Sequence, residues 1–67
     1  MDSALLKSYI VKNHDTQAML AEALGISASN LNDKINGKVD FRQNEIAAIK
    51  TRYNLTAKEV DAIFFNQ

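Results

Sequence analysis

The sequence predicts an all-α protein, a compact bundle of about five short helices that forms one domain over residues 1–67. Three observations favour this fold. Proline is absent and only two glycines occur, so few residues oppose helix formation. Apolar residues recur at spacings of three and four along five segments, which is the pattern of amphipathic helices. A chain of 67 residues, 46% of them hydrophobic, can enclose one small core.

The first two helices are predicted on either side of a polar break at residues 13–15. The first runs roughly over residues 3–12, with Asp2 or Ser3 as its cap. Its inward side chains are expected to be Leu6, Tyr9 and Ile10. Thr16 suits the cap of the second helix, whose apolar residues are Met19, Leu20, Ala23 and Leu24. Gly25 ends this helix, because glycine adopts a left-handed backbone at little steric cost.

The third helix is predicted to begin at the cap Ser27 and to carry two apolar residues one turn apart, Leu31 and Ile35. It stops at Asn36-Gly37, where a second glycine occupies the position after a helix. Residues 38–42 form a loop, in which Phe41 is expected to anchor the chain to the core.

The last two helices are predicted at residues 43–53 and after Thr56. The fourth helix buries Ile46, Ile49 and Tyr53. Thr56 and Glu59 have the spacing of a capping box, in which each side chain accepts a hydrogen bond from an unpaired amide of the other residue. The fifth helix is expected to place Val60, Ile63 and Phe64 inside and to leave Phe65 partly exposed.

The composition excludes several classes of site. There are no cysteines, and His14 is the only histidine, so a zinc site has too few ligands. The sequence contains no glycine-rich phosphate loop and no pair of carboxylates on one helix face, so we expect neither catalysis, nor a cofactor, nor a small-molecule ligand. No apolar stretch is long enough for a membrane span or a secretory signal, and we therefore expect a cytoplasmic protein.

A short helix, a glycine bend and a second short helix form a candidate helix-turn-helix. The residues that carry this pattern are Gln17, Leu20, Ala21, Leu24, Gly25, Ile26, Leu31 and the tripeptide Asn36-Gly37-Lys38. With them the sequence resembles the lambda-repressor-like family of Cro and repressor-type (XRE-like) regulators. It is most similar to the short phage regulators in which NGK is followed by a phenylalanine and a helix with an E-I start, here Phe41 and Glu45-Ile46.

The resemblance implies that the third helix enters the major groove of double-stranded DNA and that two copies bind a roughly palindromic operator. It further implies that Gln17 anchors to a phosphate. Base edges would face Ala28, Ser29, Asn32 and Asp33. Backbone phosphates would be clamped by Asn36, Lys38 and Arg42. Because related regulators often dimerise through the last helix, Phe64 and Phe65 are candidates for the contact between the two copies in such a homodimer.

The helical spacing supports part of this assignment independently of the resemblance. If Leu31 and Ile35 face the core, then Ser29, Asp33 and Asn36 lie on the opposite side, flanked by Asn30 and Asn32. Asparagine can pair bidentately with adenine, a contact that contributes about 1–3 kcal/mol of discrimination between bases. A helix used only for packing would have no reason to favour asparagine on its outer side.

Other features of the sequence favour a different class of function. The net charge is zero, whereas proteins that bind nucleic acid are usually basic, although the segment 27–53 carries five positive residues against three negative ones. Ala28 can offer only a methyl group, Asp33 brings a negative charge towards phosphates, and Lys34 replaces an aliphatic residue of the family. Two hypotheses therefore remain: a phage-type regulator that blocks polymerase at an operator, and an interaction module, such as an antirepressor, that binds another regulator.

Overall fold

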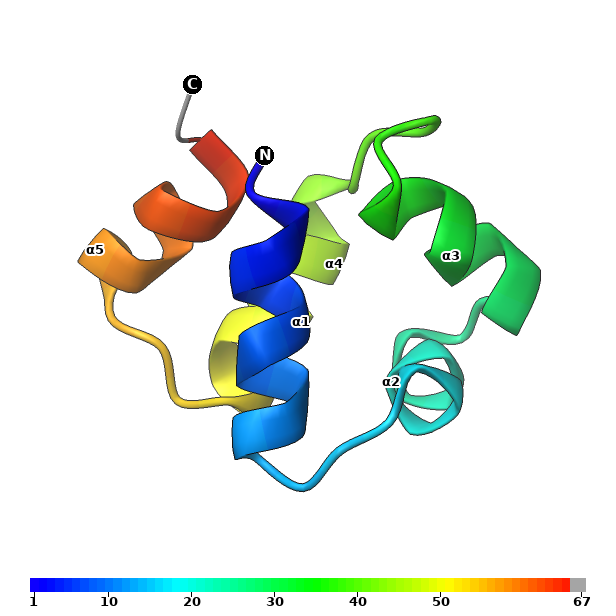
Figure 1. The fold of residues 1–67 in the computed structure, drawn as a ribbon, viewed down its shortest axis with the longest axis horizontal. Coiled ribbons are helices and arrows are strands. Elements are labelled where there is room, and N and C mark those ends of the chain that lie inside the picture. The colour runs from blue at the N-terminus through cyan, green and yellow to red at the C-terminus, as the bar shows by residue number, and fades with distance from the viewer. Residues whose placement is uncertain (66–67) are drawn as a thin grey trace.

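Five α-helices and a π-helical turn follow one another along residues 1–65, which are the residues that the computed structural model describes (Figure 1). Their bounds are α1 Ser3–Lys12, α2 Gln17–Leu24, α3 Ala28–Ile35, α4 Gln43–Arg52, α5 Ala57–Val60 and the π-helical turn η1 Asp61–Phe65. The predicted all-α bundle of about five short helices is thus confirmed. The fourth helix ends one residue earlier than predicted, because Tyr53 leaves the helical path and acts as the C-terminal cap of α4.

The helices begin at the capping residues that the sequence predicts. The side chains of Asp2, Thr16 and Ser27 each accept a hydrogen bond from the backbone amide three residues further on, at 3.0–3.1 Å. At the start of α5, the N–H of Thr56 donates to Glu59 at 2.8 Å and the N–H of Glu59 donates to the Thr56 hydroxyl at 3.1 Å. These bonds satisfy amide groups that the first turn of a helix leaves without partners.

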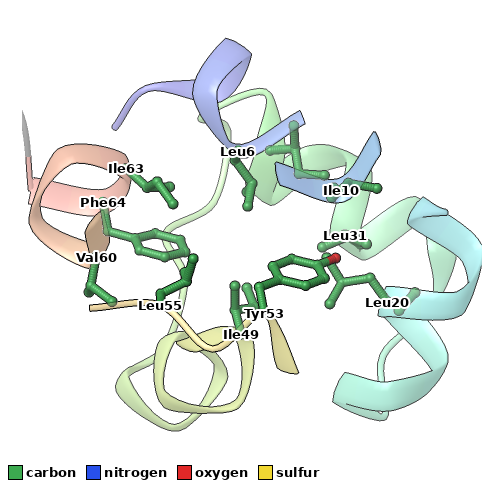
Figure 2. Packing of buried hydrophobic residues seen from close by; sticks show 12 residues of the cluster. Leu6, Ile10, Leu20, Leu31, Ile49, Tyr53, Leu55, Val60, Ile63 and Phe64 are labelled. Atoms are coloured by element: carbon green, nitrogen blue, oxygen red, sulfur yellow. The ribbon is translucent and has the colours of Figure 1, made fainter. Parts of the chain in front are cut away.

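The core lies between all the helices and consists of aliphatic and aromatic side chains that converge from each of them (Figure 2). Six residues are fully buried: Leu6, Leu20, Leu31, Ile35, Ile49 and Ile63. The loop before α4 contributes Phe41, whose ring packs edge-on against Phe64 with 5.3 Å between the ring centroids, as expected of an anchor. Of the apolar residues of α2, Met19 and Ala23 are exposed, because α2 packs against α3 through the neighbouring face that carries Leu20 and Ala21.

Polar contacts also join segments that are far apart in the sequence. The hydroxyl of Ser3 donates to the carbonyl of Ile35 at the end of α3, and the N–H of Asp2 donates to the carbonyl of Ile63 at 2.7 Å. The beginning of α1 therefore holds both α3 and η1, and the first residues of the chain lie beside the C-terminal turn (Figure 1). On the other side of the bundle, Asp15 accepts hydrogen bonds from Arg52 and Tyr53. Within residues 1–65, no helix is long and apolar enough to cross a membrane.

Candidate nucleic-acid interface

Helix α3 has one face in the core and one face in solvent. Leu31, Lys34 and Ile35 are buried, whereas the opposite side is open. The exposed residues of α3 are Ala28, Ser29, Asn30, Asn32 and the capping residue Asn36, and Asp33 is half-buried. Residues four apart stand above one another on a helix, so Ala28, Asn32 and Asn36 form one row along α3. The predicted base-facing residues are therefore accessible, and their side chains are short and polar or small.

The position of α3 is fixed by contacts at several places along its length. At its start, the turn after α2 is closed by hydrogen bonds from the N–H of Gly25 to Glu22 and from the N–H of Ile26 to Ala21, at 3.1 and 3.0 Å. Gly25 has a φ of 70°, the left-handed conformation expected of a glycine at this bend. At the other end, the Ser3 hydroxyl binds the Ile35 carbonyl. Such contacts limit how far the outer face of α3 can tilt.

The predicted phosphate-binding residues follow α3 directly. The N–H of Lys38 donates to the carbonyl of Asp33 at 2.9 Å, so the backbone folds back against the last turn of the helix. Gly37, with a φ of 80°, allows this reversal. Arg42 is exposed at the N-terminal cap of α4, and the Lys38 side chain is also exposed. Two exposed cationic side chains thus follow the C-terminal end of α3 within seven residues.

Gln17 stands apart from the other predicted contacts. It is the first residue of α2 and is half-buried. The packing of α2 against α3 sets where Gln17 lies relative to the outer face of α3. Leu20 and Ala21 of α2 and Leu31 of α3 belong to the same buried cluster. Gln17 is thus linked to α3 through the core.

Lys34 is the residue whose role the sequence did not reveal. Its side chain is 4% exposed and its ammonium lies 2.5 Å from Oε1 of Glu45, which is also 4% exposed. The same carboxylate oxygen accepts the N–H of Arg42 at 2.8 Å. Lys34 therefore joins α3 to the first turn of α4 and to the cap that carries Arg42. The sequence feature that could have indicated this ion pair is the position of Lys34 three residues after Leu31, on the inward side of the helix.

The environment of Glu45 favours its ionised form. Burial opposes the charge, but the hydrogen bonds from the Lys34 ammonium and from the N–H of Arg42 outweigh it and lower the pKa of Glu45. Glu45 also lies in the first turn of α4, where the exposed amides of the helix favour a negative charge. At neutral pH the Glu45 carboxyl group of the buried pair is thus ionised.

The predicted pair Phe64-Phe65 is divided between core and surface. Phe64 is buried against Phe41, so only Phe65 of the two can contribute contact area to a partner. Phe65 is 61% exposed and, with Val39 and Met1, borders a hollow of about 340 Å³ beside the loop that precedes α4. This surface lies outside the row of residues on α3. Among residues 1–65, no group of three or more His, Cys, Asp or Glu side chains could hold a metal ion.

One family matches the chain in comparisons with known proteins. It is described as "Protein of unknown function (DUF739)", and it matches residues 1–67, the whole length of the chain. No curated protein and no solved structure matches. The match thus relates the chain to other sequences without assigning an activity to any of the residues described above.

Proposed function

We propose that this chain, which belongs to the DUF739 family, is a small DNA-binding transcriptional regulator that inserts α3 into the major groove of an operator. The observation that carries the proposal is the outer face of α3. A helix held by contacts at both ends presents exposed hydroxyl and amide side chains, including Ser29, Asn32 and Asn36. Such groups donate and accept hydrogen bonds, as the edges of bases in the major groove require. We assign α2, the Gly25 bend and α3 to a helix-turn-helix of the Cro and repressor type.

Lys38 and Arg42 would supply the contacts to phosphate, together with the amide of Asn36 and, from the start of α2, that of Gln17. Only two of these residues are cationic, and the net charge of the chain is zero. Because few phosphates are contacted, the affinity of one copy would be modest, and because each neutralised phosphate releases counterions, that affinity would fall as salt rises. Two copies bound to a palindromic site would double the number of contacts, so we propose that the active form on DNA is a dimer.

A gel-shift titration with duplexes from the chain's own genomic neighbourhood tests the proposal. We expect one fragment to be retained, with an affinity that falls as salt rises, and we expect the double variant Ser29→Ala/Asn32→Ala to lose that retention. Asn44→Ala is the matched control, because Asn44 is an exposed asparagine on α4. Failure of every fragment to give a salt-sensitive shift would contradict the proposal.

The surface around Phe65 favours a second candidate, an interaction module that binds another regulator protein. Three large apolar side chains, Met1, Val39 and Phe65, are between 42% and 61% exposed around the hollow described above. Exposed apolar groups that cluster in this way are typical of protein-binding surfaces. Under this alternative, Phe65→Ser would abolish binding to the partner protein, whereas Ser29→Ala/Asn32→Ala would leave it unchanged. The two candidates therefore predict opposite responses to the same pair of variants.

A further inference from the structure

The outer face of α3 carries no positive charge. Lys34 is the only cationic residue of α3, and the structure turns it into the core, where Glu45 binds its ammonium. The next cations along the chain, Lys38 and Arg42, come after the end of the helix. A sequence read without the structure would place one lysine within a DNA-reading helix, but that lysine is not presented to a duplex.

This absence matters because guanine is recognised mainly by cations. In the major groove guanine offers two acceptors, O6 and N7, and the common specific contact is a bidentate hydrogen bond from arginine or lysine. Adenine instead offers one acceptor and one donor, N7 and the N6 amino group, which match the amide group of asparagine. Of the four bases, adenine is thus the one to which the exposed amides of α3 are best suited.

Two neighbours of Asn32 further favour adenine over guanine. The half-buried carboxylate of Asp33 accepts hydrogen bonds only, so it would repel the two acceptors of a guanine placed beside it. The exposed methyl group of Ala28, one turn before Asn32, can contact the methyl group of a thymine. Neither residue offers a partner to the O6 and N7 atoms of guanine.

We propose that α3 reads adenine through Asn32, with Ala28 against an adjacent thymine, and that the half-site of this chain contains no guanine read by a side chain of α3. The proposal rests on the proposed DNA-binding function and adds the base that it recognises. Sequence preference would thus come from neutral amide and methyl contacts, while Lys38 and Arg42 would supply charge without selecting bases.

Selection from a library of duplexes with a randomised central segment tests this inference, using the full chain and sequencing of the bound fraction. We expect A·T-rich half-sites with adenine preferred about 5- to 150-fold at one position. That preference should disappear in Asn32→Ala and change to guanine in Asn32→Arg, because arginine is bidentate to guanine. Asn44→Arg controls for the added charge, since it should raise overall binding without changing the preferred base.

A second pair of changes tests the role assigned to Lys34. The double variant Lys34→Met/Glu45→Gln removes the buried charges together, while the glutamine introduced on α4 would keep an acceptor for the Arg42 amide. This variant should select the same sequences as the parent chain. If the parent chain prefers guanine at a position and this double variant does not, Lys34 must leave the core to read DNA. That result would overturn the inference.

The remaining outcomes separate the inference from the proposed function. A parent motif centred on guanine at the position altered by Asn32→Arg would overturn the inference while leaving the DNA-binding function intact. If folded protein enriches no sequence at all, the proposed function itself fails and the inference falls with it.

Discussion

The ammonium of Lys34 and the carboxylate of Glu45 form an ion pair inside the bundle, between residues eleven positions apart in the sequence. The pair connects α3 with the first turn of α4, and its carboxylate also accepts the N–H of Arg42. A buried ion pair of this kind contributes little net stability, because removing two charges from water costs about as much as their attraction returns. Removing one partner alone is costly, however, since the other charge then stays in the core without compensation.

Lys34→Met is expected to destabilise the protein by about 3–5 kcal/mol, because it leaves the buried carboxylate of Glu45 without its cation. The double variant Lys34→Met/Glu45→Gln should recover most of this loss, since neither buried charge remains. Urea unfolding followed by circular dichroism measures both values. Lys50→Met, at an exposed position of α4, is the control and should change stability by no more than about 0.5 kcal/mol. Equal losses in the single and double variants would contradict this account of the pair.

Stability is expected to fall on acidification because of Asp15. Arg52 donates two hydrogen bonds to its carboxylate, at 2.8 and 2.9 Å, and the Tyr53 hydroxyl donates a third at 2.6 Å. These bonds, that from Arg52 above all, hold the pKa of Asp15 below its ordinary value of 3.8. The unfolded chain therefore takes up the proton first as the pH falls. The stabilisation is complete well above pH 3.8 and is lost as the pH falls through the lower folded pKa.

Asp15→Asn tests this dependence directly. We expect a loss of about 1–3 kcal/mol at pH 7, since asparagine cannot accept the same charge-assisted bonds, and a shallower decline of stability below pH 4. Thermal melts between pH 2 and pH 7 provide the measurement. Asp61→Asn is a matched control because Asp61 is exposed. If the stability of the parent protein and that of the Asp15→Asn variant decline equally below pH 4, the role given to this carboxylate is refuted.

The adjacent phenylalanines of η1 are expected to respond differently to substitution. Phe64→Ala should cost about 3–5 kcal/mol, because it removes a buried ring that packs against Phe41. Phe65→Ala should change stability little, since its ring is mostly in solvent. If Phe65 belongs to a dimer contact, sedimentation velocity will show weaker self-association of Phe65→Ala while the fold is retained. Unchanged association would remove Phe65 from the proposed contact.

The bend before α3 is expected to require glycine for its left-handed backbone conformation and not for lack of space around a side chain. Gly25 has a φ of 70°, and a Cβ atom added there would meet nothing within 4 Å. Gly25→Ala should therefore cost about 1–2 kcal/mol, the ordinary penalty of a left-handed conformation, without a further steric loss. Gly25→Asn should cost less, because asparagine tolerates this conformation better than alanine. Chemical unfolding of the two variants measures the difference, and an alanine variant as stable as the parent would contradict the argument.

Local patterns predicted the elements well because the forces that start and stop helices act over three or four residues. Thr16, Ser27 and the Thr56-Glu59 box bind amides of their own helices, so their spacing is visible in the sequence. The exposed row on α3 was likewise predictable from two apolar residues, Leu31 and Ile35, that define the opposite face. Periodicity was less informative for Met19, because an eight-residue helix has too few apolar positions to fix which face its neighbour will cover.

The sequence by itself determined that this chain forms a small bundle of short helices, and it determined which side of α3 faces solvent, because both follow from spacing along one segment. Only the tertiary structure decided which charged side chains are buried and with which residues they pair. Lys34 enters the core because Glu45 arrives from the next helix to compensate it, and Asp15 is bound by Arg52 and Tyr53 from a segment 37 residues away. Pairing between distant residues depends on how helices are placed against each other, and that placement is a property of the whole core.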